Sequence, residues 1–210
     1  MYALAALPVP RIVRAGGMAM RVLRVGSVAV IAAPAAAPEI PIEDALRRRH
    51  AIVLELAEQV DPLLPARFGS RLSAARVTAG LRPSVPALVK ALEHVRGRRQ
   101  MTVRLIGPPL KGPRQPAGTG TAYLAQRRSA AFDVPKELEP LSIAVEPFVV
   151  DRRMQPGRAE IRGTLFHLVP RDAVGAYREA FDAALPSIAP WKAVATGPWP
   201  PFAFAPELLE

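Results

Sequence analysis

Gly97 separates two stretches of the sequence, each with its own succession of helical and extended patterns. Residues 84–96 have the helical spacing of apolar side chains, and the run QMTVRLIG (residues 100–107) has the β-branched, apolar character of a strand. A glycine directly after a helix often takes the left-handed conformation that ends it. The chain has 210 residues, which suffices for two small domains. We therefore predict one domain over residues 1–97 and a second over residues 98–210.

The first domain combines short strands with helices. Strand-like runs cover residues 1–7, 20–25 and 28–33, and helical spacing covers residues 42–60, 72–80 and 84–96. A loop that ends at Gly16 and Gly17 follows the first run, and Gly26 with Ser27 joins the next two runs as a hairpin. This order predicts an irregular relative of the ferredoxin-like fold.

The helix expected over residues 42–60 carries its apolar residues on one side. These residues are Ile42, Leu46, Val53, Leu56 and Val60. His50 lies four residues after Leu46 and three before Val53, so we expect its ring on the buried side. No second histidine and no cysteine accompanies it, which favours a satisfied core histidine over a metal ligand or a general base.

The second domain has the element order of a ferredoxin-like fold. Strands are predicted at residues 100–107, 142–150, 159–169 and 191–195, and helices from Thr119 or Thr121 and over residues 173–185, the latter capped by Asp172. Residues 108–118 and the segment RRMQPG (residues 152–157) are rich in turn residues and predict loops. The order strand, helix, strand, strand, helix, strand is that of the split β-α-β unit, so the fold class is α+β.

Composition excludes most catalytic chemistry. There is no cysteine, and the histidines at positions 50, 94 and 167 are far apart, so thiolate chemistry is excluded and a histidine metal site is disfavoured. The segment GTGT (residues 118–121) lacks a third glycine and a following lysine, which favours a helix-entry turn over a phosphate site. No hydrolase nucleophile motif occurs. We predict a protein that is not an enzyme and that holds no cofactor and no metal.

The net charge of +10 is concentrated in the middle of the chain. Residues 65–128 carry thirteen Lys or Arg side chains and a single acid, Glu93. Such a segment favours an anionic partner or an acidic protein surface. Phe68 and Tyr123 are its only aromatic residues, so base stacking is poorly supplied and no specific nucleic-acid site is predicted.

The longest uncharged run, residues 25–38, is too short to span a membrane and contains Pro34 and Pro38. Arg21 and Arg24 precede it, which leaves a signal peptide as the alternative. The run fits a strand better, and we expect neither a membrane segment nor export.

The segment GPWPPFAF (residues 197–204) places aromatic side chains between prolines. An apolar tail of this kind has to cover something. We expect it to fold back onto its own domain, and the alternative is direct docking into a partner.

Three strings together resemble one family. LLPARFGS (residues 63–70), GTAYLAQRR (residues 120–128) and the GPWPPFAF tail look like the hallmark segments of the gas vesicle protein F/L family (GvpF/GvpL), in matching order along the whole chain. The sequence departs from the family pattern with Gln100 in place of a common Glu and with Phe202 in place of a common Tyr. The resemblance suggests these positions for partner or interdomain contacts: Arg67, Phe68, Gly69, Tyr123, Leu124, Trp199, Pro200, Pro201, Phe202 and Phe204.

The resemblance implies two α+β domains, the first with a modified ferredoxin-like fold. It also implies a non-enzymatic accessory protein of the gas vesicle, located in the cytoplasm of the cell, that acts as a minor structural component or assembly factor. Its expected partners are the major shell protein and other gas vesicle accessory proteins. Two alternatives stay open: a ferredoxin-like module that senses a small molecule, and a protein that binds nucleic acid nonspecifically through its positive charge.

Overall fold

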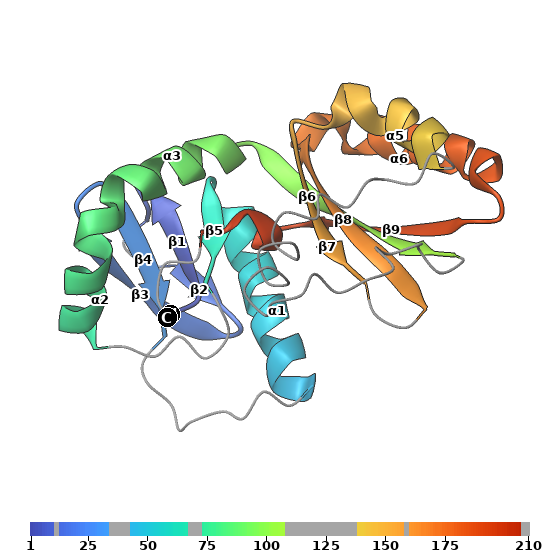
Figure 1. The fold of residues 1–210 in the computed structure, drawn as a ribbon. Coiled ribbons are helices and arrows are strands. Elements are labelled where there is room, and N and C mark those ends of the chain that lie inside the picture. The colour runs from blue at the N-terminus through green and yellow to red at the C-terminus, as the bar shows by residue number, and fades with distance from the viewer. Residues whose placement is uncertain (11–12, 34–42, 67–72, 108–137, 158–159, 207–210) are drawn as a thin grey trace, which may run out of the picture. The chain divides into compact units, whose positions relative to one another are not determined.

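The computed structural model describes residues 1–10, 13–33, 43–66, 73–107, 138–157 and 160–206. The chain forms two compact units (Figure 1). Unit 1 comprises Met1–Gln100 together with the chain from Pro198 onward, and unit 2 comprises Met101–Gly197. Each unit combines a β-sheet with helices, which confirms the α+β class.

Unit 1 contains an antiparallel sheet with the strand order β2-β3-β4-β1-β5. Its strands are β1 (Ala3–Ala6), β2 (Val13–Ala15), β3 (Met18–Val25), β4 (Val28–Ala32) and β5 (Leu63–Pro65). The predicted hairpin is confirmed, because Gly26 adopts a φ of 59° between β3 and β4, which pair from Val25 and Val28 onward. The loop expected before Gly16 instead contains β2, which pairs with the start of β3. Three residues are too few to show the alternation that identifies a strand.

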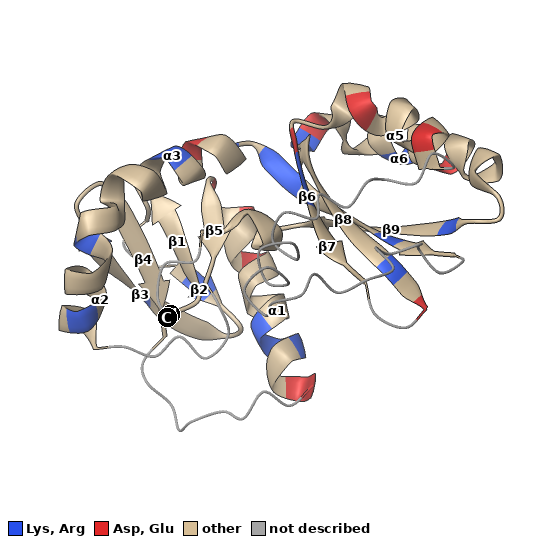
Figure 2. Ribbon diagram, in the orientation of Figure 1, with Lys and Arg blue, Asp and Glu red and all other residues tan. Residues whose placement is uncertain are grey.

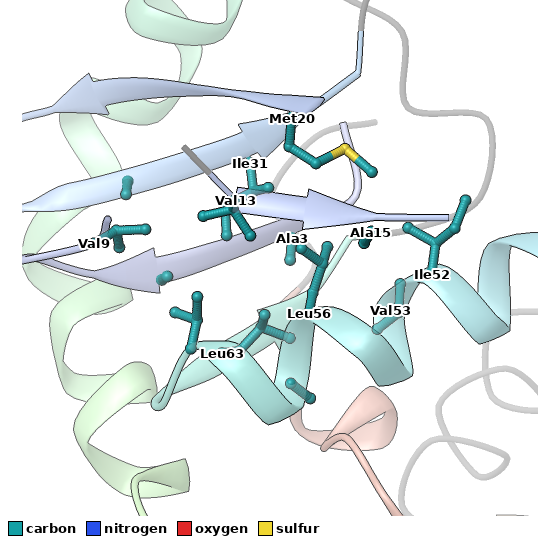
Figure 3. Close-up of a cluster of buried hydrophobic side chains, with 14 residues drawn as sticks. Ala3, Val9, Val13, Ala15, Met20, Ile31, Ile52, Val53, Leu56 and Leu63 are labelled. Atoms are coloured by element: carbon teal, nitrogen blue, oxygen red, sulfur yellow. The ribbon is translucent and has the colours of Figure 1, made fainter. Parts of the chain in front are cut away.

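Helix α1 (Glu43–Gln59) packs on one face of this sheet. Figure 3 shows Val53 and Leu56 of α1 directed at strand residues that include Ala3, and all three side chains are buried. Leu46 was expected on the same side, yet it is 45% exposed, so this prediction was wrong. The buried cluster includes no residue of α1 before Ile52, so Leu46 lies beyond the part of α1 that packs on the sheet.

Helices α2 (Ala74–Leu81) and α3 (Val85–Val95), joined by the 3-10 turn η1 (Arg82–Ser84), cover the opposite face. Leu4 points away from α1 because side chains alternate along a strand, and its cross-strand partners Val30 and Leu64 share its side. All three are buried, as are Leu88 and Leu92 of α3. Helices on both faces of the sheet distinguish unit 1 from the ferredoxin-like fold, which has them on one face.

Unit 2 has a sheet with the strand order β7-β8-β6-β9. Its elements are β6 (Arg98–Ile106), α5 (Glu139–Val145), η3 (Glu146–Phe148), β7 (Asp151–Pro156), β8 (Ile161–Pro170), η4 (Arg171–Ala173), α6 (Val174–Ala184), η5 (Leu185–Ile188) and β9 (Lys192–Trp199). The main elements run strand, helix, strand, strand, helix, strand, so the ferredoxin-like topology of this unit is confirmed. The unit boundaries fall inside β6 and β9, which therefore each continue from one unit into the other.

Two segments of unit 2 differ from their predicted secondary structure. Residues 142–150 were expected to form a strand, but α5 and η3 occupy most of them, and Leu141 and Val145 lie one helical turn apart in the core. A short apolar run does not distinguish a strand from a buried helix. The expected loop RRMQPG falls largely within β7, an edge strand that pairs with β8 from Asp151 to Pro156. Proline is tolerated at such an edge, so it was a misleading turn signal here.

The ends of the last two predicted elements also differ. Asp172 lies within η4 and makes no side-chain cap to α6, whose N-cap residue is Ala173. The final strand, predicted at residues 191–195, is β9 and continues to Trp199. The helix predicted from Thr119 or Thr121 lies outside the described residues.

A buried polar pair joins β8 to α6 in the core of unit 2. His167 Nδ1 lies 2.8 Å from the hydroxyl of Tyr177, and the two rings meet edge to face. Burial lowers the pKa of His167 to about 4, and the positive charge of Arg152, its partner residue on β7, adds to this effect. Burial also raises the pKa of the Tyr177 hydroxyl. The pair is therefore neutral at pH 7, which suits its position in an apolar core.

The buried and the exposed leucine of α1 predict a difference between two leucine substitutions. Leu56→Ala removes a fully buried side chain and is expected to lower the free energy of unfolding by about 3 kcal/mol. Leu46→Ala removes a side chain that is 45% exposed and is expected to cost less than about 1 kcal/mol. Chemical denaturation of both variants measures the difference. Equal losses of unfolding free energy in the two variants would contradict the burial of Leu56 and the exposure of Leu46.

The His167–Tyr177 pair predicts a pH dependence of stability. The pKa of His167 is about 4 in the folded chain and 6.5 in the reference state, so the unfolded chain binds the proton more tightly. The contribution of His167 is complete above about pH 6.5 and is lost as the pH falls towards 4, by about 2 to 3 kcal/mol at pH 4.5.

Denaturation at pH 7.5 and pH 4.5, compared between the wild type and His167→Gln, isolates this contribution from that of the carboxylates. Gln stays neutral at both pH values, so the variant is expected to lose less stability on acidification. An identical acid loss in both proteins would show that His167 already carries a proton when folded.

Candidate functional site

The tail that the sequence singled out packs on unit 1. Pro200, Pro201 and Phe204 are buried, and the 3-10 turn η6 (Phe202–Phe204) follows the two prolines. The chain from Pro198 onward therefore groups with unit 1, whereas the sequence placed it with residues 98–210. The tail thus folds back onto unit 1 and not onto the predicted second domain, and its aromatic partner is on α1.

The ring of His50 lies against two aromatic rings of the tail. It meets Trp199 edge to face, with 5.1 Å between ring centroids, and stacks on Phe202 at 5.4 Å and 22°. His50 is half-buried and is absent from the cluster between α1 and the sheet. The prediction that His50 packs in the core was therefore wrong, because its ring contacts the tail and not the sheet.

A buried amide holds the backbone of the tail. The side-chain oxygen of Gln100 accepts a hydrogen bond from the backbone N–H of Ala203 at 2.7 Å, and Gln100 is 4% exposed. The bond needs an acceptor but no charge, so the Gln that replaces the common Glu at this position can make it. We call His50, Gln100, Trp199, Phe202 and Ala203 the tail-docking site.

Hydrogen bonds hold the first residues of β6, next to Gln100, on the end of α1. The guanidinium of Arg99 donates to the carbonyl of Ala57 at 3.1 Å and to the carboxylate of Glu58 at 3.3 Å. Asp61 accepts a hydrogen bond from the backbone N–H of Gly97 at 3.0 Å. These bonds attach the start of β6 to the end of α1 and thereby fix the position of Gln100.

Arg49 anchors the other side of α1. Its guanidinium donates to the carbonyls of Met1 at 3.1 Å and Ala66 at 2.7 Å, and it lies 4.9 Å from the centre of the Tyr2 ring. Carbonyls and an aromatic face are good partners for a planar cation. The residue beside His50 thus holds the first strand and the end of β5 against the helix.

The sequence predicted part of this site. It singled out the tail residues Trp199, Pro200, Pro201, Phe202 and Phe204, which the structure places on unit 1. It treated His50 as a core histidine and Gln100 only as a departure from the family pattern, and the structure brings both to the tail. Arg99 and Arg49 were missed because one arginine among many gives no sequence signal. The remaining candidates, Arg67, Phe68, Gly69, Tyr123 and Leu124, lie outside the described residues.

The contacts of the tail-docking site are ring packing and a hydrogen bond. His50 is the single titratable side chain of the tail-docking site, and it has two aromatic neighbours. Within the described ranges, no three His, Asp or Glu side chains come together as a metal site. No helix in that part of the chain is long and apolar enough to cross a membrane.

The fold and the tail-docking site define a two-unit α+β protein whose second unit is inserted within the first. The model of the family described as gas vesicle synthesis protein GvpL/GvpF matches residues 1–206. The chain belongs to this family, whose members are gas vesicle structural or accessory proteins, and it therefore has an accessory role in gas vesicles.

Solved structures agree with the family. The gas vesicle protein GvpF from Microcystis aeruginosa is similar with a TM-score of 0.74 and 12% identity, over 98% of this chain and 97% of that one. GvpF from Anabaena sp. PCC7120 is similar with a TM-score of 0.72 and 12% identity, over 98% and 96%. At this identity the likeness shows the fold. Comparison with curated protein sequences finds no match.

The tail-docking site predicts that the ring of His50 holds Trp199 in place. In a Trp191→Phe background, Trp199 is the single tryptophan and reports on the tail by fluorescence. His50→Ala removes both ring contacts and is expected to weaken tail docking by about 1 to 2 kcal/mol, so that acrylamide quenches Trp199 more strongly.

His50→Phe keeps an aromatic ring at the same position and serves as the control, with quenching close to that of the parent. If His50→Ala leaves quenching unchanged, the ring contacts do not determine how the tail is held.

Proposed function

We propose that this protein is a non-enzymatic assembly factor or minor structural component that binds the major gas vesicle shell protein directly. Membership of the GvpL/GvpF family supports the accessory role. The proposed contact is an apolar ridge on unit 1 that consists of Leu46, His50 and Phe202. Other gas vesicle accessory proteins are the further partners that we propose.

The exposure of this ridge carries the proposal. Leu46 is 45% exposed and Phe202 is 37% exposed, and both are large apolar side chains. Leu46 and His50 lie one turn apart on the same side of α1, and Phe202 stacks on His50. Two exposed apolar side chains therefore flank the half-buried imidazole of His50, and large apolar side chains are unfavourable to leave in water.

The chemistry of the partner matches this ridge. The shell is built from small, hydrophobic subunits that tend to pair with one another, so a subunit outside the wall exposes apolar surface. A protein that covers this surface until the subunit is added keeps it from aggregating. Phe202 has an aromatic ring without a hydroxyl, which suits an apolar contact.

Co-expression with the major shell protein, followed by affinity capture at moderate salt, tests the proposal. Wild-type protein is expected to retain the shell protein, and Leu46→Ser/Phe202→Ser is expected to retain about one tenth or less, because two apolar side chains near the centre of a contact are lost. The matched control Ile143→Ser/Val150→Ser removes two exposed apolar side chains from unit 2, where the exposed fractions are 65% and 44%.

The control is expected to retain the shell protein as the wild type does. Circular dichroism and thermal unfolding establish that all three proteins are folded. Failure of folded wild-type protein to retain any shell protein would reject direct binding, and equal retention by both double variants would reject the ridge as the contact.

A further inference from the structure

Unit 1 contains two stretches without acids, whereas its acids among the described residues lie on and just after α1 and at Glu93 of α3. Its described ion pairs use Glu43, Glu58, Asp61 and Glu93, which lie on α1, just after it and near the end of α3. Residues 13–33 and 73–92 contain no Asp and no Glu, and they form β2 to β4, α2, η1 and most of α3. Figure 2 shows basic segments and no acidic segment along α2.

Exposed cations lie on these two stretches. Arg76 lies on α2, Arg82 on η1 and Lys90 on α3, and Arg21 lies on the face of β3 that α2 and α3 cover. All four are exposed, and none of them forms an ion pair with any residue in the described part of the chain. We call these four residues the basic face.

The basic face also has an apolar floor. The outer side of α2 has a shallow hollow, open to solvent, lined by Ala74, Ala75, Thr78, Ala79 and Arg82. Alanine methyl groups offer a surface for apolar side chains, and the guanidinium of Arg82 at its border offers a fork for a carboxylate. The surface of α2 thus presents apolar area together with positive charge that has no ion-pair partner among the described residues.

We propose that the basic face binds an acidic amphipathic helix of another protein. Apolar side chains of that helix lie on the floor of α2, and its carboxylates pair with Arg76 and Arg82. A nucleic acid fits less well, because residues 73–95 contain no Phe, Trp or Tyr on which bases stack, and phosphates leave the methyl floor unused. This surface is separate from the apolar ridge, so the proposal does not depend on shell binding.

A designed peptide tests the proposal with the full-length protein. The probe is a helical peptide of about 20 residues with Leu on one side and Glu on the other, followed by fluorescence anisotropy. Duplex DNA and a peptide with Lys in place of every Glu are the comparison probes. The Glu peptide is expected to bind, and its binding is expected to weaken as salt rises, because salt screens exposed charges.

Two variants separate charge from shape. Arg76→Glu/Arg82→Glu is expected to raise the Kd of the Glu peptide about tenfold or more, because attraction becomes repulsion. The control Arg104→Glu/Lys192→Glu makes the same charge change at exposed positions of unit 2 and is expected to leave the Kd unchanged. Ala79→Trp fills the hollow without a charge change and is also expected to weaken binding.

The outcomes that would overturn the proposal are distinct. Absence of binding to the Glu peptide, or equal binding by the Arg76→Glu/Arg82→Glu variant, rejects the basic face as its site. Tighter binding of DNA than of the Glu peptide, lost in the same variant, assigns the face to a nucleic acid instead. Unchanged binding by folded Ala79→Trp rejects the docked helix and leaves a purely electrostatic contact.

Discussion

The packing around α1 is the constraint on which the rest of unit 1 depends. One side of the helix buries Val53 and Leu56 against the sheet, and the part of α1 before Ile52 lies outside this cluster and has room for a second partner. That partner is the tail, which reaches α1 through the rings on His50 and through the amide of Gln100. Arg49 and Arg99 then attach the neighbouring strands to the same helix. A single helix thus organises segments from the beginning, the middle and the later part of the chain.

Much of the fold follows from local patterns. The β3–β4 hairpin, the helix at Glu43 and the order of elements in unit 2 were predicted, because turn glycines and helical spacing act over a few residues. The helix within residues 142–150 and the strand within RRMQPG were not predicted. An apolar run of this length does not distinguish a helix from a strand, and the proline of an edge strand resembles a turn signal. The topology was nevertheless right, because the described residues between β6 and β8 provide helix α5 followed by strand β7.

The candidate site shows where sequence patterns end. The aromatic residues of the tail predicted that it is covered, but the surface of unit 1 that covers it is determined by tertiary packing. His50 contacts the tail and not the core because the cluster between α1 and the sheet begins at Ile52. How much of a helix a neighbouring sheet covers cannot be read from the sequence of the helix. Arg99 is a clearer case, as it is one cation among several in the run RGRRQ and only its burial distinguishes it.

The insertion of unit 2 within unit 1 has a consequence for protein synthesis. Gln100 and Ala203 are 103 residues apart, yet they share one hydrogen bond. Translation proceeds at about 5 to 20 residues per second, so Gln100 is made about 5 to 20 seconds before its partner. During this interval the His50 ring on α1 is exposed, because the tail that covers it has not been made. All of unit 2 is synthesised before the tail. Unit 1 can therefore bind its last segment, the tail, only after unit 2 has been synthesised.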